Sequence, residues 1–233
     1  MGSETINPII SGWTKTSFID YPGCPATLLF LSGCNLRCPY CHNPGIVNGE
    51  YDVVPFEAIE DHITKRKNVI EAAVISGGEP TLHLGLADLC DKIKSRGLKV
   101  KIDTNGLEPD VLTTCNPDYL ALDIKTALDK YRKLNSSYDN DRERLSKSIE
   151  IVKSMGENAE IRITAAPGIV DQGDIESLCI DLRGVSKVFI QQFNPNQPML
   201  DPAYTLIKPY DVDELESMRN TFLKAGIECM LRE

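Results

Sequence analysis

Short runs of apolar residues alternate with amphipathic segments along most of the chain. The runs are hydrophobic at nearly every position, which is typical of parallel strands that are buried on both faces. We expect strands at Ala26–Leu31, Ala72–Ser76, Leu98–Asp103, Tyr119–Asp123, Glu160–Ala165 and Val185–Gln191.

Between these runs, apolar residues recur with the period of a helix that packs one face on a core. The spacing is clearest at residues 86–93 and 175–182, and residues 145–152 match most of it. Asp211, followed three residues later by Glu214, predicts a capping box at the start of a last helix near residues 212–223.

The alternation of strand and helix predicts an α/β fold made of βα units with right-handed crossovers. Six strand candidates are too few for an eight-fold barrel, whereas a partial barrel and an open parallel sheet both fit the pattern. We find no internal repeat, low-complexity run or linker. The sequence therefore predicts a single domain over residues 1–233.

Composition narrows the class of protein further. Hydrophobic residues make up 42% and charged residues 25% of the chain, which excludes an intrinsically disordered protein. The net charge of −9 and the absence of a long basic block argue against nucleic-acid binding. No apolar run approaches the length of a membrane span, and no secretory signal is visible, so we expect a cytoplasmic protein with no membrane partner.

Polar, glycine-rich segments follow each expected strand at its carboxyl end. In folds of this kind the chemistry collects on those loops. We therefore expect one composite site built from residues 32–34, 76–80, 103–106, 123–125, 167–168 and 192–194.

Three of the eight cysteines lie close together, at Cys34, Cys38 and Cys41. In a reducing compartment such a cluster indicates metal binding or catalysis rather than disulfides, and thiolates favour zinc or an iron–sulfur cluster. A structural zinc ion would need a fourth ligand, for which His42 and Cys24 are the local candidates. Three thiolates on a four-iron cluster instead leave one iron open for a ligand. Zinc and plain core thiols stay as alternatives.

The other cysteines and histidines carry weaker signals. Cys90 and Cys179 occupy apolar helix positions and are expected to be core thiols. Cys115 and Cys229 have no ligand motif beside them. His62 is expected on the surface of a helix, and His83 has no assigned role.

Two motifs resemble those of radical S-adenosylmethionine (SAM) enzymes. Cys34–Cys41 has the C-x3-C-x2-C spacing of that superfamily, with the aromatic Tyr40 before the last cysteine, and Ser76–Pro80 resembles its second motif. Within the superfamily, Cys41–Pro44 is similar to the activases of glycyl-radical enzymes. Lys15–Gly23 resembles the opening of the activating proteins of anaerobic ribonucleotide reductases.

The resemblance implies a partial (β/α)6 TIM-type barrel with a [4Fe-4S] cluster held by Cys34, Cys38 and Cys41. It implies that S-adenosyl-L-methionine binds the open iron, and that its reductive cleavage gives a 5′-deoxyadenosyl radical that removes a hydrogen atom from a backbone glycine of a partner. The implied partners are a glycyl radical enzyme and a flavodoxin- or ferredoxin-type reductant. Since the radical forms on the cofactor, no side chain is expected to act as a catalytic acid or base.

The resemblance also assigns cofactor-binding residues. Glu79 is expected to accept a hydrogen bond from the ligand ammonium group, and Gly77 and Gly78 to let the backbone approach the ligand closely. The further positions implied to contact S-adenosylmethionine are Tyr40, Asp103, Asp123, Lys125 and Asn194.

A monovalent cation site is implied at Asp103, Thr104, Asp123 and Ile124, with helix capping and loop hydrogen bonding as the alternative. Arg162 lies in a segment that is similar to the fifth strand of the family, with an ion pair on that strand as the alternative. Asn194 stands where pyruvate formate-lyase activase has a histidine, and Asp20 resembles an acid near the partner's glycine loop, with a turn residue as the alternative.

Three classes of function compete at this point. The first is a radical activase with a protein substrate, and the second is a radical enzyme acting on a small molecule, similar to the short 7-deazaguanine synthases. The third is an electron carrier or structural cluster protein, which has no need of the glycine–glycine–glutamate motif. The region 45–69 contains no cysteine, so a single cluster is expected.

Overall fold

The computed structural model describes residues 8–232. Contacts divide the chain into two compact units. Of the described residues, the first unit contains those up to Cys34, Gly45–Thr104 and Asp110–Leu120, and the second contains Asn35–Pro44, Asn105–Pro109 and those from Ala121 onwards.

Four strands form the sheet of the first unit: β1 (Ile10–Ser17), β2 (Ala26–Leu31), β3 (Ala72–Gly77) and β4 (Lys99–Thr104). Strand β1 runs antiparallel to β2, whereas β2, β3 and β4 are parallel neighbours in that order. The helices of this part of the chain are α1 (Pro44–Asn48), α2 (Phe56–Lys65), the short 3-10 helix Pro80–Leu82, α3 (Leu86–Ser95) and α4 (Pro109–Cys115).

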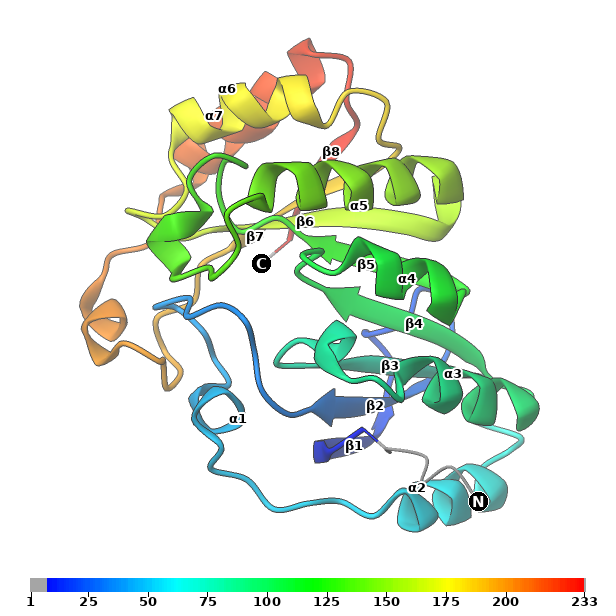
Figure 1. Ribbon diagram of the computed structural model, residues 1–233. Coiled ribbons are helices and arrows are strands. Elements are labelled where there is room, and N and C mark those ends of the chain that lie inside the picture. Colours follow the sequence, from blue (N-terminus) through cyan, green and yellow to red (C-terminus); the bar gives the residue numbers. More distant parts are fainter. Residues whose placement is uncertain (1–7, 233) are drawn as a thin grey trace. The chain divides into compact units, whose positions relative to one another are not determined.

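Strand β5 (Tyr119–Asp123) begins in the first unit and ends in the second. In the second unit β6 (Ala159–Ala165), β7 (Val188–Gln192) and β8 (Cys229–Arg232) are parallel. Figure 1 shows α5 (Asp141–Met155), α6 (Gln172–Asp181) and α7 (Val212–Lys224) together along these strands. Three 3-10 helices, Tyr131–Leu134, Gly156–Asn158 and Pro202–Leu206, complete this unit's described part.

All six expected strands are present, with most ends within one residue of the prediction. The seventh strand of the chain starts at Val188 rather than Val185, because residues 185–187 form an irregular segment with a bend before it. The capping box is confirmed: Asp211 Oδ1 accepts the Glu214 N–H at 2.9 Å, and Glu214 Oε2 accepts the Asp211 N–H at 2.8 Å. The prediction missed β1 and β8. Polar residues interrupt the apolar residues of the edge strand β1, and β8 has only four residues.

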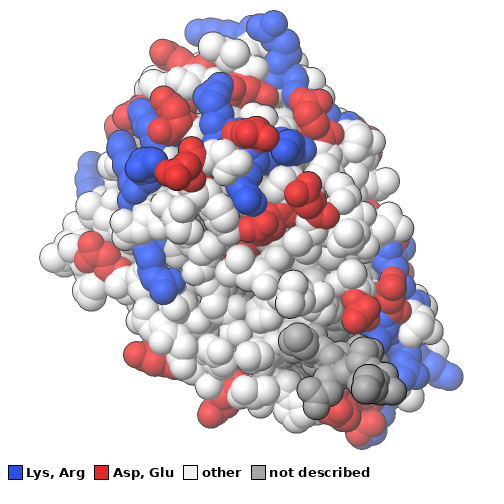
Figure 2. Space-filling model, viewed as in Figure 1, with Lys and Arg blue, Asp and Glu red and all other residues white. Residues whose placement is uncertain are grey.

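The interior strands are buried along almost their whole length, as their continuous apolar character predicts. Ala72, Ala73, Val74 and Ile75 of β3 have no exposed surface. On the face drawn in Figure 2, positive and negative side chains are interspersed over α5, α6 and α7. Among residues 8–232, no helix has the length and apolar character that would be needed to cross a membrane.

Candidate functional site

The loop at the end of β3 (residues 77–80, the glycine loop) packs directly on the backbone that leads to Cys34. The Gly78 N–H donates to the Leu31 carbonyl at 2.9 Å, and the Glu79 N–H donates to the Gly33 carbonyl at 2.8 Å. A Cβ atom at Gly78 would lie 1.7 Å from the Gly33 oxygen, and one at Gly77 would lie 2.4 Å from the Leu31 nitrogen. The two glycines are therefore required by the protein's own backbone, whereas the sequence suggested only close approach to a ligand.

Glu79 lies at the centre of a hydrogen-bond network in this loop. Its side chain is buried, with 1% of the residue exposed. Its Oε1 accepts hydrogen bonds from the Thr81 N–H at 3.1 Å, the Thr81 hydroxyl at 2.6 Å and the Thr104 hydroxyl at 2.7 Å. Glu79 thus joins the loop after β3 to the end of β4. Its expected contact with a ligand ammonium group stays a prediction.

His83 has a role that the sequence did not indicate. Its Nε2 lies 2.9 Å from the Ser32 carbonyl oxygen, so Nε2 carries the hydrogen and donates it. Ser32 is two residues before Cys34. His83 therefore fixes the backbone that leads into residues 34–41, the cysteine segment. The two residues are 51 positions apart in the sequence, and no local pattern relates them.

Backbone hydrogen bonds of the second unit hold the later part of the cysteine segment. The Cys41 N–H donates to the Cys38 carbonyl at 3.0 Å, which closes a turn between these two cysteines. The Arg37 N–H donates to the Leu134 carbonyl at 2.8 Å, and the Pro39 carbonyl accepts the Asp201 N–H at 2.9 Å. Two segments far along the chain therefore fix the backbone on either side of Cys38.

The three clustered cysteines are divided between the units, with Cys34 in the first and Cys38 and Cys41 in the second. No disulfide involves any of the eight cysteines, all of which belong to the described residues. Within residues 8–232, no three His, Cys, Asp or Glu side chains are gathered closely enough to hold a metal ion. The assignment of these three thiols as ligands stays a prediction.

Tyr40 is buried beside the cysteines of the second unit. Its hydroxyl is without a hydrogen-bond partner among the described residues. Burial raises its pKa well above the usual value, with nearby Cys38, Tyr131 and Asp123 adding to the effect. Since buried polar groups almost always have a partner, this hydroxyl is suited to contact a bound ligand. The expected contact of Tyr40 with S-adenosylmethionine stays a prediction.

Asp123, at the end of β5, faces two cationic groups. Its Oδ1 accepts from Arg162 Nε at 2.7 Å, and its Oδ2 lies 3.2 Å from Lys125 Nζ. Although burial alone would raise the pKa of Asp123, the charges of Arg162 and Lys125 hold it well below the usual value. Burial would lower the pKa of Lys125, but Asp123 and the nearby Cys38 raise it. The structure shows the ion pair that was the alternative expected for Arg162.

The expected cation site has protein partners at both carboxylates. Asp103 Oδ1 lies 3.1 Å from Lys101 Nζ within the buried interior of the first unit, and the Thr104 hydroxyl donates to Glu79. With Asp123 also paired, both carboxylates take part in ion pairs, which neither the cation site nor the alternative of helix capping and loop hydrogen bonding anticipated. The cation site stays a prediction. Lys101 was not among the predicted site residues, although Lys101 and Asp103 share one face of a strand and could have indicated a buried pair.

The two other expected site residues make local hydrogen bonds. Asn194 is exposed after β7, and its Oδ1 accepts the Asn196 N–H at 3.0 Å. Asp20 accepts a short hydrogen bond from the Ser17 hydroxyl, and its backbone carbonyl accepts one from Lys101 Nζ at 2.6 Å. This arrangement matches the turn role that the sequence left open for Asp20.

The remaining cysteines take part in the packing of their own units. Cys24 precedes β2, whereas Cys34 follows that strand's other end, and Cys24 packs on the apolar cluster that contains Tyr21 and Tyr119. Cys90 and Cys179 are buried as predicted, and Cys90 shares a hydrogen bond with the buried Cys115. His62 is half-buried rather than on the surface, because its ring packs edge-on against Trp13 at 5.2 Å.

The chemistry of the residues present suits the cofactors that the resemblance implies, although no three metal-binding side chains among residues 8–232 are gathered closely enough to hold a metal ion. The segment offers three thiols, which are the ligands that iron–sulfur clusters use. The buried Tyr40 hydroxyl lacks a protein partner, and two cations face Asp123, which suits a ligand that carries a carboxylate. The glycine loop leaves no room for a side chain beside the backbone before Cys34.

Residues 28–178 match the family model of the radical SAM superfamily. A Methanocaldococcus jannaschii protein named as a glycyl-radical enzyme activating enzyme is 34% identical over 195 residues, which cover 80% of each chain. The pyruvate formate-lyase-activating enzyme of Staphylococcus epidermidis is 31% identical over 170 residues, 66% of each chain. A 7-carboxy-7-deazaguanine synthase of Aquifex aeolicus is 34% identical over 84 residues, 36% of this chain and 37% of its own.

Solved structures show the same fold. The structure of TYW1 with a lysine-pyruvate adduct bound has a TM-score of 0.63 at 17% identity, covering 85% of this chain and 73% of TYW1. QueE from Escherichia coli has a TM-score of 0.57 at 17% identity, covering 97% of this chain and 92% of QueE. These likenesses confirm the expected α/β fold of the partial-barrel type.

Proposed function

Because the chain belongs to the radical SAM superfamily, we propose that this enzyme is an activase that installs a glycyl radical on a partner protein. The proposal rests on the extent of the chain's likeness to the activating enzyme of M. jannaschii, which covers 80% of each chain. The likeness to the pyruvate formate-lyase-activating enzyme covers two-thirds of each chain.

The alternative is a radical enzyme that acts on a small molecule. It is supported by the 7-carboxy-7-deazaguanine synthase, whose likeness covers little more than a third of either chain. The activating enzymes match over much longer stretches at similar identity, and this difference favours the activase.

Cys34, Cys38 and Cys41 are the residues that would hold a [4Fe-4S] cluster. When bound, such a cluster would supply one electron for the reductive cleavage of S-adenosylmethionine. The chain's own residues bind and orient: the Tyr40 hydroxyl is available to the ligand, and Lys125 and Arg162 place positive charge beside Asp123. Glu79 fixes the glycine loop and is proposed also to accept from the ligand ammonium group.

The proposed partner is an anaerobic ribonucleotide reductase. The similarity of Lys15–Gly23 and Cys41–Pro44 to the activating proteins of such reductases supports it. Within the first motif, Phe18 and Ile19 are 74% and 91% exposed, and adjacent exposed apolar side chains suit contact with another protein. A flavodoxin- or ferredoxin-type protein is the proposed reductant.

Isotope transfer tests the proposal. The partner is produced with deuterium on its glycine α-carbons and mixed anaerobically with cluster-loaded enzyme, S-adenosylmethionine and dithionite. The proposal predicts deuterium in the 5′-deoxyadenosine that forms, and none when the partner's radical glycine is replaced by alanine. Formation of 5′-deoxyadenosine without deuterium, at a rate that the partner does not change, would overturn the proposal in favour of a small-molecule substrate.

A further inference from the structure

Three polar side chains lie side by side at the carboxyl ends of the last three strands. Thr164 of β6 pairs with Gln191 of β7, and Gln191 pairs with Arg232 of β8. Paired residues of neighbouring parallel strands point to the same face of a sheet, so these three side chains form one continuous row, the polar row. In α/β folds the ligand lies beyond the carboxyl ends of the strands, which puts the polar row in a position to contact one.

The polar row shares its face of the sheet with the ion pair of the candidate site. Arg162, whose Nε donates to Asp123 Oδ1 at 2.7 Å, precedes Thr164 by two residues, and residues two apart on a strand share a face. The opposite face carries Ile163 and Ile190, which have no exposed surface, and α5 and α7 pack on these strands. Since the helices take the apolar face, the polar row is left on the side of the candidate site.

Two members of the polar row have unused hydrogen-bonding groups. Thr164 and Gln191 are half-buried, and neither side chain makes a hydrogen bond to another residue of the described chain. The next residue differs, because Gln192 Nε2 donates to the Tyr210 carbonyl at 3.0 Å. A hydroxyl and a carboxamide can each donate as well as accept. Thr164 and Gln191 are therefore available to a ligand that has both kinds of group.

Arg232 is held in place at the end of the polar row. Its guanidinium group donates to both carboxylate oxygens of the buried Glu160, at 3.1 and 3.0 Å, and lies 3.4 Å from the centre of the Phe189 ring. The carboxylate neutralises its charge, and the pair leaves further N–H groups of the guanidinium for a ligand. The Arg232 side chain is 38% exposed. The polar row thus presents donors and acceptors without a net charge.

We infer that the polar row binds the main chain of the partner segment that carries the radical glycine. Neighbouring strands are about 4.8 Å apart, so the row extends over about 10 Å, the length of three residues of extended chain. A main chain is uncharged and offers one N–H and one C=O group per residue, which matches an uncharged row of donors and acceptors. A glycine has no side chain to hold its backbone away from the row. The inference rests on the proposed function, because only an activase takes a protein segment as its substrate.

Activation of an anaerobic ribonucleotide reductase tests the inference. Cluster-loaded enzyme is mixed anaerobically with S-adenosylmethionine, dithionite and increasing amounts of the reductase, and glycyl radical formation is followed by electron paramagnetic resonance. Gln191→Leu and Thr164→Val each remove a hydrogen bond and should raise the KM for the reductase about 5- to 10-fold. Thr164→Ser keeps the hydroxyl and should keep the KM. Formation of 5′-deoxyadenosine without the reductase should be the same in all three variants as in the unmodified enzyme.

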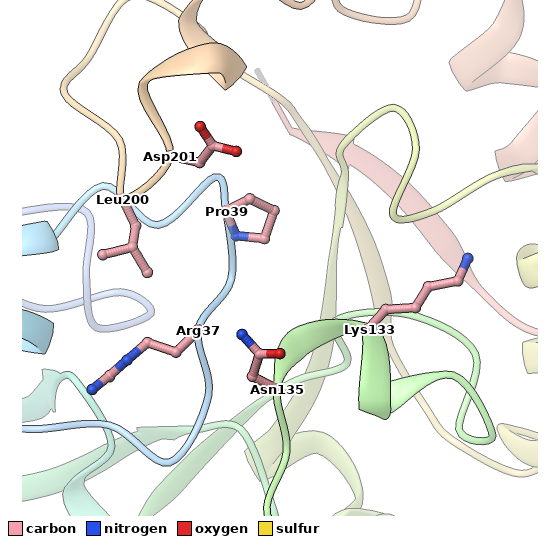
Figure 3. A pocket seen from close by; sticks show the side chains of 6 residues that line it. All are labelled: Arg37, Pro39, Lys133, Asn135, Leu200 and Asp201. Carbon is pink, nitrogen blue, oxygen red and sulfur yellow. The ribbon is translucent and has the colours of Figure 1, made fainter.

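Two controls change the second unit outside the polar row. Thr221→Val makes the same substitution at a half-buried threonine on α7. Lys133→Met removes a cation from the wall of a pocket of about 530 Å³ to which no residue of the polar row contributes, and Figure 3 shows the side chains that line it. Both controls should keep the KM for the reductase within about twofold of the unmodified value. The iron content of each variant shows that it carries its cluster.

An unchanged KM in both Gln191→Leu and Thr164→Val, with full radical yield, would overturn the inference and leave the proposed function standing. A raised KM in Lys133→Met alone would also overturn it, because the reductase would then contact the pocket in Figure 3. Slower formation of 5′-deoxyadenosine by Gln191→Leu without the reductase would assign the row to the cofactor instead. Failure of the unmodified enzyme to form any radical would refute the proposed function, and the inference with it.

Discussion

Replacing Glu79 tests whether this carboxylate holds the glycine loop together. In Glu79→Ala, three donors lose their common acceptor: the Thr81 N–H, the Thr81 hydroxyl and the Thr104 hydroxyl. A buried donor without a partner costs about 1–3 kcal/mol, and the two hydroxyls can partly reorient. We therefore expect the free energy of unfolding to fall by about 3–4 kcal/mol. In Glu79→Gln the amide oxygen can still accept, and the expected loss is only about 1 kcal/mol.

The measurement is urea unfolding of the cluster-free protein, followed by fluorescence of the single tryptophan, Trp13, which lies in the same unit. Glu71→Ala, at an exposed acid just before β3, is the matched control and should change stability by less than about 0.5 kcal/mol. Thr104→Val should destabilise the unmodified protein but have much less effect in the Glu79→Ala background, because the two residues share one hydrogen bond. An unchanged unfolding midpoint in Glu79→Ala would refute the reasoning.

The remaining predictions concern the cysteines, the glycine loop and the ion pair of Asp123. Anaerobic reconstitution should give about four irons per chain in the unmodified protein. Substitution of Cys34, Cys38 or Cys41 by Ala should abolish iron binding. The control variants Cys90→Ala and Cys179→Ala should still bind iron. Tight zinc binding without iron would contradict the cluster assignment. Gly78→Ala should displace the loop and strongly lower both stability and S-adenosylmethionine affinity, because its Cβ would lie 1.7 Å from the Gly33 oxygen. Gly12→Ala is the control and should be tolerated, because the nearest contact of its Cβ would be at 3.4 Å. Equal stability of the two variants would contradict this prediction and show that the loop can shift freely. The pKa of Asp123 is lower in the folded protein than the unfolded value of about 3.9, so its ion pairs stabilise the fold above about pH 4 and this contribution is lost as the pH falls further. The stability difference between the unmodified protein and Asp123→Asn, from urea unfolding, should therefore shrink between neutral pH and about pH 3, and a difference independent of pH would contradict the ion-pair account.

Local patterns in the sequence predicted most of the fold. Continuous apolar runs such as residues 72–76 have few alternatives to a buried strand, and they were located almost to the residue. The capping box of Asp211 and Glu214 is local as well. Strand β1 was missed because Ser11, Thr14 and Lys15 interrupt its apolar residues, as an edge strand allows.

The contacts of the site depend on residues that are far apart in the sequence. Glu79 and Thr104 are 25 positions apart, and His83 and Ser32 are 51 apart. Whether a polar side chain contacts a ligand or another part of the protein is decided by such tertiary contacts. The motif therefore located the glycine loop, but it could not show that the loop's glycines pack on the protein's own backbone.

Electron paramagnetic resonance of the partner tests the central claim most directly. Cluster-loaded enzyme is incubated anaerobically with reductant, S-adenosylmethionine and an anaerobic ribonucleotide reductase. The account predicts a glycyl doublet on the reductase, which disappears when the reductase's radical glycine is replaced by alanine or when the enzyme carries Cys38→Ala. Absence of the doublet from every glycyl radical protein supplied, together with turnover of a small molecule and stoichiometric 5′-deoxyadenosine, would contradict it.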